Sequence, residues 1–164
     1  MSASLSRFAS MLERLSLAIA VIGGIILLTT ACIVIISVVG RALFNQPVPG
    51  DYEFVQIGLA VSVFSFLPYT QIQNGHVSVD TFTLWLPSRM NRYIDSAWDI
   101  LLSLVFALFA LGLWAEMLDM RRFGGTLMEV PWPLWPIYGV CAVLCGFYTV
   151  TAIASTIIKL GVKG

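Results

Sequence analysis

The stretch from Leu15 to Gly40 contains no charged residue. A helix needs about 20 apolar residues to cross a hydrocarbon core of about 30 Å, and this stretch exceeds that length. It is also far longer than the apolar region of a signal peptide, which has about 7–15 residues, and no clear small-residue cleavage site follows it. Because a lone strand in lipid would leave backbone groups unpaired, we predict a retained transmembrane helix over residues 15–40.

Three further apolar stretches extend this prediction to the whole chain. Hydrophobic residues make up 59% of the sequence and charged residues 11%, against roughly 25% charged in an ordinary soluble domain. The formal net charge is zero, so the sequence offers no basic field for a nucleic acid. We therefore expect an all-α integral membrane protein that forms a single membrane domain over residues 1–164. Its four transmembrane helices are predicted at about residues 15–40, 54–73, 97–118 and 134–158.

The third span is interrupted by acidic residues at both ends. Asp99 and Glu116 bracket a stretch of roughly 24 Å at 1.5 Å per residue, which is short for a span. Either both carboxylates lie at the membrane interfaces, or the helix is longer and Asp99 faces protein. We favour a long helix that begins near Ser88, a plausible N-cap after a proline. Arg92, Asp95 and Asp99 would then share one face, where they can pair.

The distribution of basic residues predicts the orientation. With a cytoplasmic N-terminus, the cytoplasmic side holds Arg7, Arg14, Arg89, Arg92, Lys159 and Lys163. The other side then holds only Arg41, Arg121 and Arg122. This bias predicts that the N- and C-termini are both cytoplasmic. Residues 80–87 are too short to span, so we expect a short interfacial amphipathic segment between helices 2 and 3, with Asp80 as its N-cap.

Polar and aromatic residues mark the external helix ends. In "NQPVPGDYEF" we expect a turn, with Asp51 capping the second helix and Glu53 near its positive N-terminus. Gly124 and Gly125 are expected to end the third helix. Interfacial anchors are predicted among the tryptophans, namely Trp85, Trp132 and Trp135. The external aromatic group consists of Trp132, Trp135 and Tyr138, and for this group a docking surface for an external partner is the alternative.

Candidate chemistry is sparse. His76 is the only histidine, and a metal site needs three or four ligands, so we expect no metal, no cofactor and no catalytic residue. The segment "NGHVSVD" favours a loop with His76 hydrogen-bonded and Asp80 capping, although a proton relay, a gate or a subunit contact stays open. Cys141 and Cys145 lie one turn apart in an apolar helix, which favours packing over redox chemistry.

The first, second and fourth spans contain no ionisable side chain of the kind that marks an ion or substrate path. We therefore expect that the protein transports nothing alone. The charges collect at helix ends instead. Arg41 and Glu53 lie on the same side in this topology, where they either pair or are solvated independently.

The order of these motifs is similar to a known family. Four spans, "VVGRALFNQPVPGDYEF", "NGHVSVD", an "LP" break and "VPWPLWPIY" resemble the small membrane subunit of TRAP transporters, the DctQ-like family. The resemblance implies a non-enzymatic scaffold in the bacterial inner membrane. Its partners would be a large multi-span subunit, which binds sodium and moves organic acids, and a periplasmic substrate-binding protein. Residues matching the family pattern, with a structural or assembly role, are Arg41, Glu53, His76 and Asp80.

Charged residues beside the external aromatic group suggest where the binding protein docks, namely Arg121, Arg122 and Glu129. The alternatives are a self-contained small four-helix transporter and an integral-membrane redox protein that uses Cys141, Cys145 and His76.

Overall fold

The computed structural model describes residues 3–45, 49–73 and 88–161. These ranges form four helices, α1 (Ala3–Phe44), α2 (Asp51–Ile72), α4 (Ser88–Phe123) and α5 (Trp135–Gly161). No strand occurs in the described ranges, where an isolated bridge joins Thr126 to Pro133 between α4 and α5. All four helices are long and apolar enough to cross a membrane. The predicted all-α fold with four transmembrane helices is therefore confirmed.

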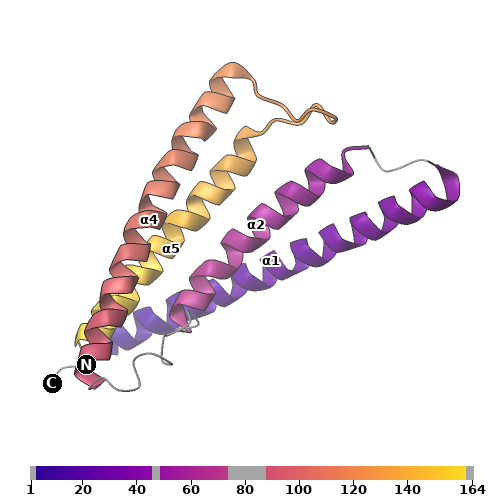
Figure 1. Ribbon diagram of the computed structural model, residues 1–164. Coiled ribbons are helices and arrows are strands. Elements are labelled where there is room, and N and C mark those ends of the chain that lie inside the picture. Colours follow the sequence, from indigo (N-terminus) through magenta and orange to yellow (C-terminus); the bar gives the residue numbers. More distant parts are fainter. Residues whose placement is uncertain (1–2, 46–48, 74–87, 162–164) are drawn as a thin grey trace.

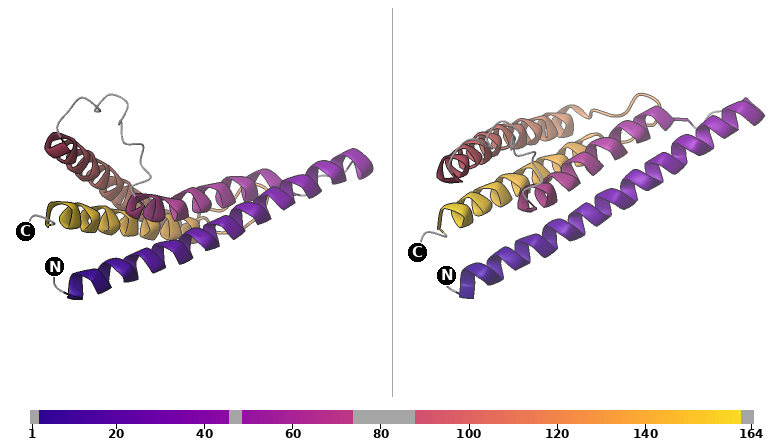
Figure 2. Two further views of the ribbon diagram at one scale, coloured as in Figure 1. Left: turned by 90° about the horizontal axis from the view of Figure 1, so that it is seen from below. Right: turned by 60° about the horizontal axis from the view of Figure 1, so that its bottom comes forward.

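The helices form two pairs that lie at an angle to each other (Figures 1 and 2). Helix α1 packs along α2, α4 packs along α5, and the pairs meet mainly through α2 and α5. The beginning of α1 and the end of α5 lie at the same end of the molecule, which we call the terminal end (Figure 1). We call the opposite end, where α2 and α5 begin, the loop end. Which end faces the cytoplasm stays a prediction.

Small residues let α1 and α2 approach closely. A Cβ atom added at Gly23 would lie 2.6 Å from the Ser65 Cβ, and one at Gly58 would overlap the Thr30 hydroxyl. The Thr30 and Ser65 hydroxyls are satisfied within their own helices, by the carbonyls of Ile26 (2.8 Å) and Val61 (2.7 Å). Since lipid supplies no hydrophobic force between helices, close backbone contact of this kind is what holds them together.

The seam between α4 and α5 contains larger side chains. Tyr148 is fully buried, and its ring centroid lies 4.2 Å from that of Phe106. Cys141 and Cys145 are buried in α5 and neither forms a disulfide. This is the environment expected of packing residues.

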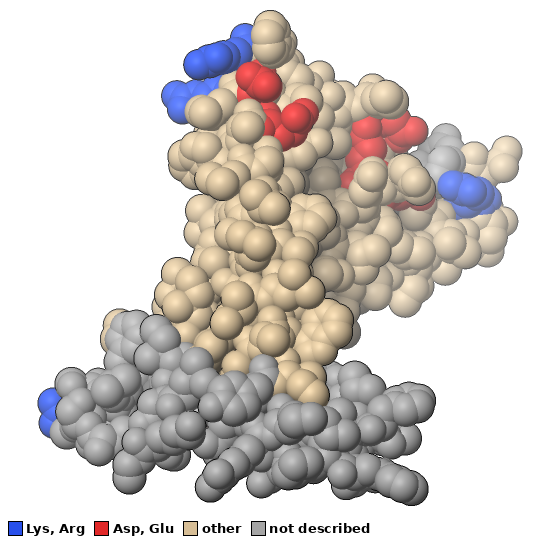
Figure 3. Space-filling model, turned by 60° about the vertical axis from the view of Figure 1, so that its left-hand side comes forward, with Lys and Arg blue, Asp and Glu red and all other residues tan. Residues whose placement is uncertain are grey.

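Most large apolar side chains of α1 and α4 point away from the rest of the chain. Exposed examples are Ile22, Ile25, Leu28, Ile35, Leu104, Leu108 and Leu111. In the face shown in Figure 3, an uncharged band separates the charged groups at the two ends of the molecule. In a membrane this surface contacts lipid or a neighbouring subunit, so its exposure costs nothing in stability.

The helix ends confirm some predictions and correct one. Helix α4 begins at Ser88, as predicted, and ends at Phe123. Gly124 then adopts a left-handed conformation (φ +68°), and the Gly125 N–H donates to the Met120 carbonyl at 3.1 Å. The prediction that Asp51 caps α2 was wrong. The N-cap is Gly50, which has a positive φ of 74° and no side chain to offer.

Candidate functional site

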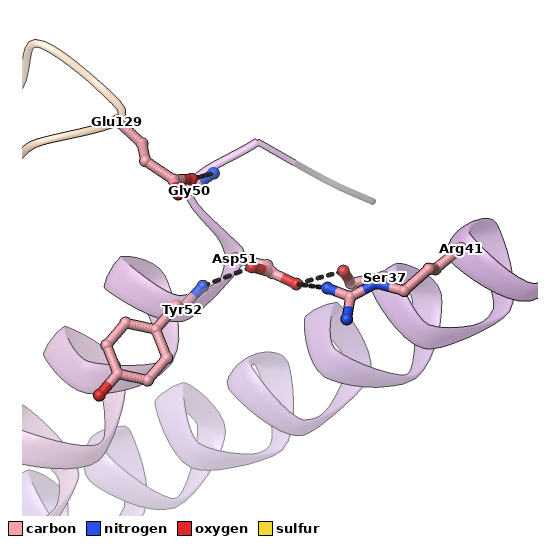
Figure 4. Close-up of polar contacts among 6 residues, drawn as sticks. All are labelled: Ser37, Arg41, Gly50, Asp51, Tyr52 and Glu129. Carbon is pink, nitrogen blue, oxygen red and sulfur yellow. Dashed lines mark hydrogen bonds and ion pairs between the residues drawn. The ribbon is translucent and has the colours of Figure 1, made fainter. Parts of the chain in front are cut away.

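Polar residues from three segments meet at the loop end (Figure 4). Ser37 and Arg41 come from the last turns of α1, and Asp51 and Glu53 come from the first turn of α2. Glu129 comes from the loop between α4 and α5. We call these five residues, with Gly50, the loop-end cluster.

Asp51 ties α1 to α2. One carboxylate oxygen, Oδ2, accepts a hydrogen bond from the Ser37 hydroxyl and lies 3.8 Å from Arg41 Nη2 (Figure 4). Ser37 and Arg41 can both reach this oxygen because residues four apart share a helix face. The other oxygen, Oδ1, accepts the backbone N–H of Tyr52 at 2.7 Å. Ser37 is buried, whereas the Arg41 side chain is 65% exposed.

The partner of Arg41 is therefore Asp51 and not Glu53. The sequence left open whether Arg41 and Glu53 pair with each other or are solvated independently, and the structure shows neither arrangement. In the described part of the chain Arg41 pairs with Asp51, and Glu53 binds backbone N–H groups of the α4–α5 loop. Asp51 and Glu53 are two residues apart on a helix, and side chains with that spacing do not face the same way. Only one of them can meet α1, so the other turns toward the α4–α5 loop.

Glu53 holds that loop through its backbone. Its Oε1 accepts the N–H groups of Met128 (2.5 Å) and Glu129 (3.1 Å), and its Oε2 accepts that of Val130 (3.4 Å). In return, Glu129 Oε2 accepts the Gly50 N–H at 2.6 Å. We call this reciprocal contact the loop clamp, defined by Gly50, Glu53 and residues 128–130. Hydrogen bonds to a carboxylate are stronger than those between neutral groups.

The clamped loop has an ordered shape of its own. The Leu127 N–H donates to the Trp132 carbonyl at 3.0 Å, and the Leu134 N–H donates to the Gly125 carbonyl at 3.1 Å. The Trp132 ring meets Phe54 of α2 edge-on, with centroids 6.4 Å apart. Met128, by contrast, is 99% exposed. The loop therefore presents an apolar side chain from a fixed backbone.

Gly50 is required where the loop crosses α2. A Cβ atom there would lie 2.6 Å from the Val130 Cγ2, and the backbone has a positive φ that other residues rarely adopt. The glycine therefore lets the Gly50 N–H reach the Glu129 carboxylate.

The predicted docking residues lie at the loop end. The Arg121 guanidinium carbon is 5.7 Å from the centroid of the Trp135 ring, within range of a cation–π contact. Arg121, Arg122, Trp132 and Trp135 are all exposed. Glu129 is exposed too, but its carboxylate already holds Gly50, so part of its binding capacity is used within the chain.

Three predicted positions, His76, Asp80 and Trp85, lie outside the described residues. The structure therefore places two members of the family pattern, Arg41 and Glu53. Both belong to the loop-end cluster, where each contributes to a different contact.

A second polar group at the other end of α2 was not predicted as a unit. Gln71 Nε2 donates to Asp99 Oδ1 of α4 at 2.9 Å and to Ser155 Oγ of α5 at 3.3 Å. The Tyr148 hydroxyl of α5 donates to Gln71 Oε1 at 3.0 Å. Gln71 is 1% exposed and Asp99 is 7% exposed. We call these four residues the Gln71 cluster.

Part of this cluster could be read from the sequence. The long α4 helix with Asp99 facing protein was the favoured prediction, and it is confirmed. The side chains of Arg92 and Asp95 lie outside the described part, so their pairing with Asp99 stays a prediction. A second feature of the sequence could have indicated this cluster, namely the amide of Gln71 near the end of an apolar helix. A buried amide in a membrane helix needs hydrogen-bond partners on other helices.

Both clusters join helices and do not assemble reactive groups. Within the described residues, no three His, Cys, Asp or Glu side chains come together as metal ligands. The loop-end cluster connects α1, α2 and the α4–α5 loop, and the Gln71 cluster connects α2, α4 and α5. The arrangement is suited to holding helices in fixed positions.

Comparison with known proteins gives the family. A family model described as "Tripartite ATP-independent periplasmic transporters, DctQ component" matches residues 30–160. No curated protein and no solved structure gives a match. The family is a transporter component and not an enzyme. The matched region contains both clusters and most of the chain, and the chain therefore belongs to the DctQ family, the small membrane component of TRAP transporters.

Proposed function

We propose that this chain is the scaffold subunit of a sodium-coupled importer of organic acids in the bacterial inner membrane. It supports the large multi-span transport subunit and helps to dock the periplasmic substrate-binding protein. Sodium and substrate bind to those partners and not to this chain. The observation that carries the proposal is the pair of polar clusters, which attach the two helix pairs to each other at both ends of α2.

A scaffold role follows from what these contacts do. A transport domain that moves across a membrane must move against a part that stays still. Helix pairs that are hydrogen-bonded to each other at both ends resist relative motion. The exposed apolar faces of α1 and α4 leave a wide surface for a neighbouring subunit or lipid.

Docking is supported by the loop between α4 and α5. The loop clamp fixes its backbone, so a partner would not have to order it on binding, and that lowers the entropic cost of association. The surface offers Met128, Trp132 and the two exposed arginines, Arg121 and Arg122. Aromatic, Met and Arg side chains are enriched in protein interfaces. The predicted orientation puts this loop on the periplasmic side.

Co-purification tests the proposal. The tagged chain, expressed with the large subunit and the binding protein of its transporter, is expected to retain the large subunit through purification. Arg41→Ala and Glu53→Ala are expected to reduce the yield of the complex without changing which organic acid is taken up. Arg14→Ala, an exposed arginine near the start of α1, is the matched control. Failure of the large subunit to co-purify, or a changed substrate preference in either variant, would contradict a scaffold role.

A further inference from the structure

Among the residues that the structure describes, side-chain hydrogen bonds link the two helix pairs in two places, one near each end of α2. At the loop end they belong to the loop clamp, and toward the terminal end they belong to the Gln71 cluster. Glu53 and Gln71 are about 27 Å apart along α2 at 1.5 Å per residue. That distance is close to the roughly 30 Å thickness of a hydrocarbon core. The two attachments therefore lie near opposite faces of the membrane.

Gln71 differs from the other members of its cluster because it bonds to both helices of the other pair. Its amide NH₂ group serves Asp99 of α4 and Ser155 of α5, and its carbonyl accepts Tyr148 of α5. A buried group that loses its hydrogen-bond partner bears the full cost of desolvation. An apolar side chain at position 71 would remove at once the three bonds by which Gln71 links α2 to α4 and α5.

Gln73 shows that a glutamine near the end of α2 does not by itself bond to the other helix pair, so the link depends on position 71 and not on the residue type. Its amide donates to Glu13 of α1 at 3.4 Å and to the Tyr69 hydroxyl of α2 at 3.3 Å. Both partners belong to its own helix pair. Gln73 is exposed, whereas Gln71 is buried. Two glutamines two residues apart therefore have opposite roles, one within a pair and one between pairs.

We propose that Gln71 is the joint that locks the α4–α5 pair against the α1–α2 pair toward the terminal end. The loop clamp is the second attachment. Without the Gln71 joint, the terminal ends of the two pairs move apart by rotating about the loop clamp, while the loop ends stay together. The inference shares the Gln71 cluster with the proposed scaffold function, but it concerns the conformation of this chain alone. Co-purification with the large subunit tests the scaffold function separately, so the two failures can be distinguished.

Distances between spin labels on the full-length chain in lipid nanodiscs test this directly. Labels at exposed positions 17 of α1 and 101 of α4 report on the terminal end, and labels at positions 43 of α1 and 123 of α4 report on the loop end. The background replaces the native cysteines with alanine, namely Cys32, Cys141 and Cys145. Electron paramagnetic resonance then gives a distance distribution for each pair of labels.

Gln71→Leu is expected to broaden the terminal-end distribution and shift it to longer distances, with the loop-end distribution unchanged. Gln73→Leu, the matched control, is expected to change neither. If Gln71→Leu does not fold, Tyr148→Phe and Ser155→Ala each remove one bond of the cluster and are expected to give smaller shifts of the same kind. An unchanged terminal-end distribution in the folded variants, or equal changes at both ends, would overturn the proposal.

Discussion

At the scale of single residues, the acidic groups of the loop end show how far spacing alone can predict a site. Asp51 and Glu53 follow a turn and open α2, and both could be recognised from the sequence as helix-end carboxylates. Their separation of two residues also implies that they point in different directions. What the spacing cannot give is which of them meets α1, because that depends on how α2 is rotated about its axis. The structure assigns Asp51 to Ser37 and Arg41, and Glu53 to the loop.

Glu53→Ala is expected to release the α4–α5 loop, because three backbone N–H groups lose their acceptor. We expect faster hydrogen exchange at residues 128–130 and a loss of about 1.5–3 kcal/mol in the stability of the clamped loop, the range for hydrogen bonds to a charged group. Hydrogen-exchange mass spectrometry in nanodiscs measures both. Asp119→Ala, which removes an exposed carboxylate at the end of α4, serves as the control and should leave exchange in the loop unchanged.

At the scale of helices, the presence of four spans was predictable and the pairing of the helices was not. Helix α1 begins at Ala3 and so extends well before the apolar stretch predicted from Leu15. Apolar length and glycine signals predicted four spans and the end of α4 at Gly124, since those properties are local. Helix α1 carries no charge from Leu15 to Gly40, but small and polar residues recur along it near a seven-residue spacing, and these are the buried ones, namely Ser16, Ala20, Gly23, Thr30 and Ser37. This stripe indicates the face of α1 that packs, but it does not say which helix packs against it. The close approach at Gly23 and Gly58 depends on residues from two helices together. No pattern within one helix contains that information.

Gly58→Ala tests the seam between α1 and α2. A methyl group there would overlap the Thr30 hydroxyl, so the helices must separate, and overpacking of this kind costs about 1–3 kcal/mol. We expect a lower melting temperature by circular dichroism in detergent. Gly146→Ala of α5 is the matched control, because a Cβ atom there has no neighbour within 4 Å. Alanine is the better helix former by up to about 1 kcal/mol, so this control should be neutral or stabilising. A melting temperature for Gly58→Ala equal to that of Gly146→Ala would show that the seam is looser than described.

At the scale of the whole molecule, the chain consists of two helix pairs attached at two levels, with apolar outer faces. The sequence predicted the class of protein well, because every residue contributes to the hydropathy and the charge of the chain, and these contributions add up. It did not predict the Gln71 cluster as a unit, because its members come from α2, α4 and α5 and are separated by long stretches of sequence. Long-range polar contacts of this type decide how the pairs sit together, and they are the part of the site that only the structure supplies.

The docking surface gives a prediction at this scale. Replacing both Arg121 and Arg122 with glutamate is expected to weaken binding of the periplasmic protein to the assembled membrane complex, and the weakening should shrink as salt is raised. Exposed charges are screened over about 8 Å at physiological ionic strength, so a direct electrostatic contact must show this dependence. Surface plasmon resonance at several salt concentrations measures it. Arg7→Glu combined with Arg14→Glu, near the start of α1, is the control. Equal affinity for the Arg121/Arg122 variant and the wild type at every salt concentration would remove these residues from the docking surface.

The central claim is that this chain supports transport without carrying it out. Proteoliposomes that contain this chain alone, the large subunit alone, or both together, each supplied with the binding protein and an inward sodium gradient, test it most directly through uptake of the labelled organic acid. The account predicts strong uptake with both membrane subunits, little with the large subunit alone and none with this chain alone. Sodium-driven accumulation by liposomes that contain only this chain would contradict it.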